Sequence, residues 1–278
     1  MKLLGLIALM TSLTVADSQG APAPDRLVPY KSIGNLQLDL HVFLPNGHQD
    51  SDQRPAVVFF FGGGWMMGTP TQFYSHARHF ADRGLVVFVA DYRVKNTHGT
   101  SPRESVMDAK SAMRWVRSHA RELGVDPARL IAAGASAGGH LAAATAMLRD
   151  FDDPSDDRSV SCRPEALVLF NPVIDNGPGG YGHDRVRAYW RAFSPIEHIG
   201  PDTPPTVLFL GTEDEEVPVA TAERFKRAME QHGRRCDLHL YPGQKHGFFN
   251  VSNRVYFEKT LMEMDRFLVS LGYLAPAR

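Results

Sequence analysis

The sequence predicts an α/β fold in which a mostly parallel, eight-stranded sheet carries helices on both faces. Two observations lead to this prediction. The chain contains short, continuously apolar runs of the kind found in covered parallel strands. These runs alternate along the chain with segments whose apolar residues have helical spacing. That alternation implies right-handed crossovers and a single layered domain. The 278 residues, 43% of them hydrophobic and 22% charged, are enough for one sizeable domain of this class.

The predicted strands fall into two kinds. From Leu36 to Val42, leucine and valine alternate with polar residues, which is the period of a half-buried antiparallel strand. The predicted strands from residue 56 to residue 210 are short and almost wholly apolar, as in the interior of a parallel sheet, whereas the last predicted strand alternates. The eight predicted strands cover residues 26–31, 36–44, 56–61, 85–90, 129–133, 166–170, 206–210 and 236–241.

The predicted helices lie between these strands. The longest has Val106, Ala109, Met113 and Val116 at spacings of three and four, with Gly124 where a C-cap is expected. Residues 175–205 are rich in glycine and aromatic side chains and carry no clear helical or strand period. The residues 151–164 are acidic and are expected to cross the surface. The predicted helices are 71–83, 102–123, 139–149, 221–232 and 251–271.

The N-terminus differs from the rest of the chain. Lys2 precedes a short apolar run, and small residues follow near Ala16. This pattern predicts a secretory signal peptide over residues 1–20 and a secreted or periplasmic protein whose folded domain is 21–278; the alternative is a buried N-terminal helix. Cys162 and Cys236 are compatible with one disulfide or with two free thiols.

Charge and hydropathy narrow the classes of partner. The formal net charge is −1, which gives no argument for binding to nucleic acid or to a membrane surface. No apolar run is long enough to span a bilayer. We therefore expect neither a nucleic acid partner nor a membrane span.

One stretch carries a catalytic pattern. Residues 134–138 read G-x-S-x-G around Ser136, between a predicted strand and a predicted helix. This pattern is typical of a nucleophile elbow, a turn so sharp that glycine is needed two positions before and after the serine. Ser136 is the candidate nucleophile. Because a serine hydroxyl is a poor nucleophile at neutral pH, it needs a base and a group that orients the base.

Reactive groups in such a sheet lie where strands end at their carboxyl side. His246 meets that condition, since it follows the last predicted strand in a glycine-flanked loop. His140 lies close in sequence to Ser136 but points along its helix, and His239 falls within a strand. We also expect His76 and His79, at helical spacing, to lie on a solvated face.

The candidate acid is Asp214, which follows the strand 206–210. That strand should lie beside the one that precedes His246, so the Asp214 carboxylate can accept the Nδ1–H of the imidazole. Asp175, which follows the preceding strand, is the rival.

A run of glycines follows the central strand 56–61. Glycines at that position let the backbone approach a ligand and direct amide N–H groups at it. We expect the amides of Gly63 and Gly64, with that of Ala137, to form an oxyanion hole. Neither G-x-G-x-x-G nor a following Gly-Lys-Ser/Thr is present, which excludes a phosphate-binding loop of those types.

The motifs together carry a family resemblance. They occur in the order 62–65 (GGGW), 91–93 (DYR), 134–138 (GASAG), 211–214 (GTED) and 245–247 (KHG). In this order they resemble the α/β-hydrolases, most closely the acetylesterase and carbohydrate-esterase members related to hormone-sensitive lipase. The resemblance implies the α/β-hydrolase fold, a Ser136–Asp214–His246 triad, oxyanion donors at Gly63, Gly64 and Ala137, no cofactor and no metal. The sequence departs from the pattern of that family at one position, where Phe61 replaces the histidine that usually precedes the glycines.

The segments around the site suggest the substrate. About thirty residues separate the predicted signal peptide from the central strand, and they are predicted to be strands, so we expect an open site without a large cap domain. Trp65, Tyr181 and Trp190 are candidate aromatic platforms for a carbohydrate; the alternative is that some of them belong to the core.

The sequence therefore predicts a serine carboxylesterase that removes acetyl groups from a polysaccharide or oligosaccharide such as acetylated xylan. A feruloyl-type or general short-chain carboxylesterase is the alternative. A prolyl-oligopeptidase-like peptidase is disfavoured, because the chain is too short for a gating domain. A dienelactone-type hydrolase would need cysteine at position 136. A non-catalytic binding module is disfavoured by the intact set of Ser136, Asp214 and His246.

Overall fold

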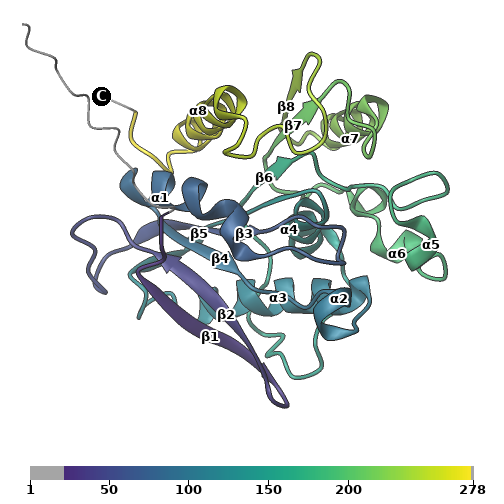
Figure 1. Ribbon diagram of the computed structural model, residues 1–278. Helices are drawn as coiled ribbons and strands as arrows, with labels where there is room; N and C mark the ends of the chain where they lie inside the picture. The colour runs from purple at the N-terminus through teal and green to yellow at the C-terminus, as the bar shows by residue number, and fades with distance from the viewer. Residues whose placement is uncertain (1–21, 277–278) are drawn as a thin grey trace, which may run out of the picture.

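The computed structural model describes residues 22–276, so the predicted signal peptide lies outside the described residues. One eight-stranded sheet forms the centre of the molecule (Figure 1). Because the inner strands are short apolar runs, they are buried almost throughout. The strands are β1 (Arg26–Ile33), β2 (Leu36–Phe43), β3 (Arg54–Phe60), β4 (Val86–Ala90), β5 (Val125–Ala135), β6 (Ala166–Phe170), β7 (Thr206–Gly211) and β8 (Cys236–Tyr241).

The strand order decides where a site can form. The sheet runs β1-β2-β4-β3-β5-β6-β7-β8. Strand β2 is antiparallel to β1 and β4, and the pairs from β4 to β8 are parallel. The chain moves from β3 to one side, to β4, and then returns to the other side of β3, to β5. The carboxyl ends of β3 and β5 therefore lie side by side at a topological switch point, the usual place for a ligand in such sheets.

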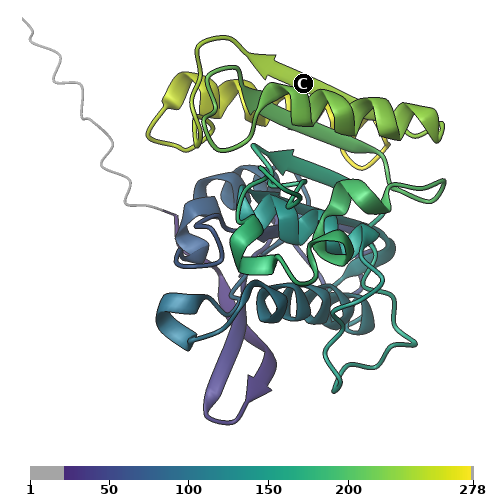
Figure 2. The same cartoon turned by 90° about the vertical axis from the view of Figure 1, so that its right-hand side faces the viewer.

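Helices cover both faces of the sheet, as predicted. Helices α1 and α8 lie together on one face, and α3 and α4 pack on the other (Figures 1 and 2). The helical elements are a 3₁₀ turn (Pro70–Phe73), α1 (Tyr74–Asp82), α2 (Lys95–His98), α3 (Pro102–Ser118), α4 (Ala137–Met147), α5 (His183–Val186), α6 (Trp190–Phe193), a second 3₁₀ turn (Pro195–His198), α7 (Val219–Gln231) and α8 (Arg254–Ser270).

Two predicted segments differ from the observed ones. Helix α3 ends at Ser118 rather than at residue 123, and the chain then turns into β5. Gly124 does not cap the helix. It is required because the chain passes so close to Gln49 that a Cβ at Gly124 would lie 2.5 Å from the Gln49 carbonyl oxygen. The segment 175–205, for which the sequence predicted no element, contains the short helices α5 and α6.

A buried ion-pair network holds the first hairpin to α3. The Asp108 carboxylate is fully buried and accepts from the Lys31 Nζ at 2.8 Å and from the Arg93 Nε at 2.8 Å. Arg114, also on α3, pairs with Asp152 at 2.6 Å. The acidic segment 151–164 is therefore tied to α3 by ion pairs as well as crossing the surface.

The expectation of a solvated face for His76 is wrong. Its side chain is fully buried on α1, and its ring packs against Phe59, Phe170 and Phe257 at centroid distances of 6.1, 5.5 and 4.7 Å. Burial away from any acceptor lowers its pKa to about 3. The i, i+3 spacing indicates that His76 and the partly buried His79 lie on the same face of α1, but it does not indicate what that face contacts. In the structure this face packs against α8 and the sheet.

The burial of His76 predicts an acid-sensitive stability. Because its folded pKa is below the unfolded value, the unfolded chain binds a proton that the folded chain refuses, so stability falls as pH falls from about 6.5 towards 3. We expect His76→Phe to reduce the loss of unfolding free energy between pH 7 and pH 4.5 by about 2 to 3 kcal/mol. Denaturant titrations at both pH values measure this.

The exposed His232 offers the matched control for this prediction. His232→Phe should leave the acid-induced loss of stability close to that of the unmodified protein. If His76→Phe lost as much stability on acidification as the unmodified protein does, the assignment to His76 would be contradicted.

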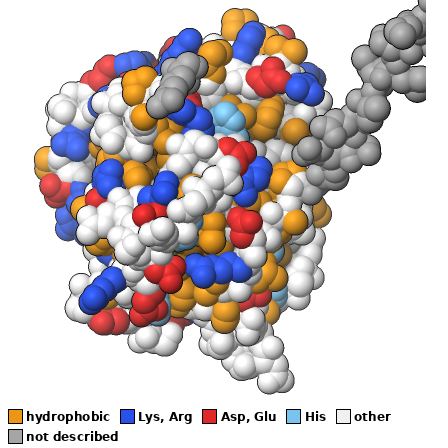
Figure 3. Space-filling model, turned by 90° about the vertical axis from the view of Figure 1, so that its left-hand side faces the viewer, with side chains coloured by type: hydrophobic (Ala, Val, Ile, Leu, Met, Phe, Trp, Pro, Cys, Tyr) orange, Lys and Arg blue, Asp and Glu red, His pale blue; other side chains and the backbone are white. Residues whose placement is uncertain are grey.

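The surface charges, the lengths of the helices and the two cysteines complete the description of the fold. Lys, Arg, Asp and Glu side chains are interspersed on the face in Figure 3, without a large area of one sign. Among residues 22–276, no helix is long and apolar enough to cross a membrane. Cys162 and Cys236 are free thiols.

Candidate active site

The turn between β5 and α4 has the geometry of a nucleophile elbow. Ser136 stands between them with φ 52° and ψ −119°, a strained conformation for a residue with a side chain. A Cβ at Gly134 would lie 2.2 Å from the Gly138 carbonyl oxygen, and one at Gly138 would lie 2.0 Å from that of Phe60. Only glycine fits at these two positions, and the turn leaves the partly exposed Ser136 at the carboxyl edge of the sheet.

The structure brings the predicted base and acid to this serine. The His246 Nε2 lies 2.9 Å from the Ser136 Oγ, and its Nδ1 lies 2.8 Å from the Asp214 Oδ2. The Asp214 side chain is buried, and its Oδ1 accepts the backbone N–H groups of Glu216 and Val217, both at 2.9 Å. A carboxylate held in this way favours Nδ1–H on the imidazole, which leaves Nε2 as the acceptor for the serine proton.

The rival residues lie elsewhere. Asp175 forms an ion pair with Arg224 on α7. His140 is buried, with its Nε2 at 2.8 Å from the Phe193 carbonyl oxygen, and burial lowers its pKa to about 4. His239 remains on β8, where its ring packs near Phe209.

The glycine run after β3 forms a wall of the cavity that contains Ser136. The amides of Met66 and Met67 donate to the Gly63 carbonyl oxygen at 3.0 and 3.1 Å, which curls the loop. The Gly62 amide is used within the protein, because it donates to the Gln72 Oε1 at 2.7 Å. Among residues 22–276, the N–H groups of Gly63 and Gly64 have no hydrogen-bond acceptor, and both glycines line the cavity.

Ala137 supplies the other predicted donor position. It is the first residue of α4, where backbone N–H groups have no partner within the helix. The helix dipole adds partial positive charge at the same point. Amides from two separate segments thus lie near Ser136, an arrangement suited to an oxygen that gains negative charge.

The chain is similar to known esterases over most of its length. It is 42% identical to apo esterase 2 of Thermogutta terrifontis, with a TM-score of 0.88, covering 93% of this chain and 98% of that one. The chain belongs to the α/β-hydrolase serine esterases. The BD-FAE family profile matches residues 40–177, and the prolyl oligopeptidase family profile matches residues 175–269.

Two curated relatives are more distant. An acetylxylan esterase of Xylanibacter ruminicola is 27% identical over 82% of this chain and 47% of its own length. A probable isoprenylcysteine alpha-carbonyl methylesterase of Arabidopsis thaliana is 27% identical over 81% of this chain and 51% of its own. The chain thus spans about half the length of these relatives.

The protein accommodates Phe61 in place of the usual histidine by stacking. The Phe61 ring lies face to face with Tyr92 at a centroid distance of 4.0 Å, and the Tyr92 hydroxyl donates to the Phe61 carbonyl oxygen at 2.7 Å. Gln72 joins the glycine loop to the histidine loop, since its Nε2 donates to the Asn250 Oδ1 at 3.0 Å. These contacts brace the glycine loop without a histidine.

Asn171 is a site residue that the sequence reasoning missed. Its Nδ2 lies 3.2 Å from the His246 Nε2, and its Oδ1 accepts the Gly247 amide at 3.1 Å. The residue is buried and has a φ of 33°, which asparagine tolerates better than most residues. Its place directly after β6, at the carboxyl edge of the sheet, was the available signal.

The three candidate aromatic platforms have different positions. Tyr181 lines the cavity that contains Ser136, and this cavity has a volume of about 390 Å³. Trp65 is in the core, 1% exposed, with its ring edge-on to His140 at 5.1 Å. Trp190 is partly exposed beside Arg191, outside the lining of this cavity. Trp65 is turned inward because the loop reverses at this residue, where φ is 59°. Met66 and Met67, which follow Trp65, line this cavity.

Proposed function

We propose that this protein is a serine carboxylesterase that hydrolyses short-chain esters, acetyl esters foremost, on a carbohydrate such as acetylated xylan or its oligosaccharides. The observation that carries the proposal is the hydrogen-bonded series from the Ser136 Oγ to the His246 Nε2 at 2.9 Å and from the His246 Nδ1 to Asp214 at 2.8 Å. This series lies in an open cavity beside the amides of Gly63 and Gly64, which have no acceptor within residues 22–276.

In the proposed reaction, the His246 Nε2 takes the proton of Ser136 as its Oγ attacks the ester carbonyl carbon. The amides of Gly63, Gly64 and Ala137 stabilise the oxyanion, each donor contributing about 3 kcal/mol. His246 then gives its proton to the leaving alcohol as the acyl–enzyme forms. Water, deprotonated by His246, attacks the acyl–enzyme and releases the acid and free Ser136.

Two observations support a short acyl group. The cavity of about 390 Å³ must hold the acyl group together with part of the alcohol. Structures of the Thermogutta terrifontis relative are described as propionate bound and butyrate bound.

Support for a carbohydrate comes from the acetylxylan esterase relative and from Tyr181 beside the cavity. We also propose export, on the N-terminal pattern of Lys2 and the apolar run after it.

A chain-length series tests the proposed activity. We expect the kcat/KM for p-nitrophenyl esters to be highest at acetate to butyrate and at least about tenfold lower at octanoate, because a longer chain extends beyond the cavity. Acetate release from acetylated xylan should accompany it. A preference for octanoate would contradict the short acyl group, and turnover of peptide p-nitroanilides without ester turnover would favour a peptidase.

A further inference from the structure

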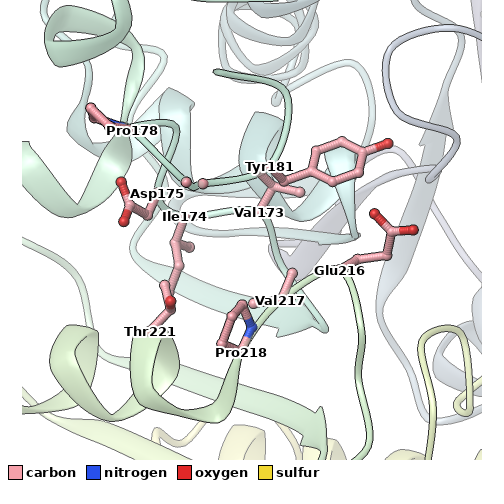
Figure 4. Close-up of a pocket in the computed structure, with 11 residues that line it drawn as sticks. Val173, Ile174, Asp175, Pro178, Tyr181, Glu216, Val217, Pro218 and Thr221 are labelled. Carbon is pink, nitrogen blue, oxygen red and sulfur yellow. The ribbon is translucent and has the colours of Figure 1, made fainter. Parts of the chain in front are cut away.

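A second cavity adjoins the one that contains Ser136. It has a volume of about 220 Å³ and lies between the segment after β6 and the start of α7. The two cavities share two lining residues, Tyr181 and Glu216. Figure 4 shows the Tyr181 ring and the Glu216 carboxylate on one side of the second cavity, with Asp175 and Pro178 on the other. Tyr181 and Glu216 therefore mark the passage between the cavities.

Glu216 brings negative charge to this passage. The neighbouring Glu215 pairs with Lys245 at 3.5 Å, and Asp175 pairs with Arg224. Among residues 22–276, the exposed Glu216 side chain forms no ion pair. Its backbone is held in place, because its N–H donates to the Asp214 Oδ1 at 2.9 Å. A carboxylate without a protein cation keeps its acceptor positions free for a ligand.

Tyr181 supplies an apolar surface beside this charge. Its ring is half-buried, and a Cβ at Gly64 would lie 2.6 Å from its hydroxyl oxygen, so the tyrosine reaches over the glycine loop. The Arg185 guanidinium lies 5.3 Å from the ring centroid and donates to the Gly64 carbonyl oxygen at 2.6 Å. These contacts fix the ring next to the passage.

The chemistry of ester hydrolysis assigns a direction to the passage. The leaving oxygen must face His246, which protonates it, while the carbonyl oxygen faces the amides of the glycine loop. Glu216 follows the Asp214 that orients His246, and both Glu216 and His246 line the first cavity. The leaving oxygen thus belongs on the His246 side of the first cavity, whose lining also includes the Glu216 that is shared with the second cavity.

We propose that the second cavity is the alcohol subsite and that it takes an uncharged, hydroxyl-rich alcohol. The Glu216 carboxylate accepts hydrogen bonds from its hydroxyl groups, and the Tyr181 ring packs against its carbon face. An alcohol that carries a carboxylate is repelled by Glu216. This inference rests on the proposed function and adds to it the residues that select the leaving group.

The test compares two acetate esters, a monoacetylated methyl β-xyloside and p-nitrophenyl acetate, whose alcohol has no hydroxyl groups beyond the ester oxygen. In Glu216→Gln we expect the ratio of kcat/KM for the xyloside to that for p-nitrophenyl acetate to fall about tenfold, chiefly through KM. Glu215→Gln, which neutralises the adjacent glutamate outside both cavity linings, is the matched control and should leave the ratio within twofold.

The outcomes separate this subsite from the proposed function. An unchanged ratio in Glu216→Gln, whether the two activities stay constant or fall together, would overturn the subsite. A fall confined to acetylcholine, added as a cationic ester, would also overturn it in favour of a cation site. If the unmodified protein hydrolysed none of these esters, the proposed function would fail first.

Discussion

Replacing Ser136 with alanine is expected to lower kcat for p-nitrophenyl acetate by about 10⁴-fold or more. The reason is that the alanine variant has no atom to form the acyl–enzyme, while the oxyanion amides and the cavity remain. The 2.9 Å contact to the His246 Nε2 is the geometry on which this expectation rests. Steady-state and single-turnover kinetics of the purified variant measure the effect, with circular dichroism to verify folding.

A pair of aspartate variants provides the control for the triad. Asp214→Asn should lower kcat by about 10⁴-fold, because an amide beside the His246 Nδ1 favours the wrong tautomer. Asp175→Asn changes a carboxylate that pairs with Arg224 and should lower kcat by less than about tenfold. Full activity in Ser136→Ala, or equal losses in the two aspartate variants, would contradict the assigned roles.

A covalent probe gives a readout that is independent of turnover. Paraoxon phosphorylates an activated serine hydroxyl, which forms a bond to phosphorus as p-nitrophenolate leaves. If Ser136 is the nucleophile here, intact-mass measurement should find one diethylphosphoryl group on the unmodified protein and none on Ser136→Ala.

The second large effect concerns stability. Replacing Asp108 with alanine is expected to lower the free energy of unfolding by about 3 to 5 kcal/mol. The carboxylate is fully buried between Lys31 on β1 and Arg93, so its removal leaves Arg93 without its carboxylate partner and Lys31 with Asp153 alone. Guanidinium denaturation at pH 7 measures the change as a lower midpoint with an unchanged slope.

An exposed ion pair offers the comparison for Asp108. Asp184 pairs with Arg187, and both side chains are more than two-thirds exposed. Asp184→Ala should change the unfolding free energy by less than about 0.5 kcal/mol, because solvent screens such a pair. Equal effects of the two substitutions would mean that the buried network contributes nothing beyond surface charge.

Features that depend on short-range backbone geometry could be predicted from the sequence alone. The buried strands follow from apolar runs, and the strand–helix alternation led to the parallel sheet. The elbow around Ser136 could be predicted because backbone segments approach Gly134 and Gly138 so closely that no side chain fits at either position. The rule that reactive groups follow strand ends selected His246 and Asp214, which the structure places at hydrogen-bond distance.

Burial depth and side-chain direction were decided by packing between distant segments. Helical spacing identified the face that holds His76 but not what covers it, and α8 covers it from the far end of the chain. Trp65 is turned into the core by the reversal of its own loop. Asn171 reaches His246 because β6 and β8, whose carboxyl ends carry these residues, lie on either side of β7. Periodicity along one segment carries no information about its neighbours, so these positions required the tertiary structure.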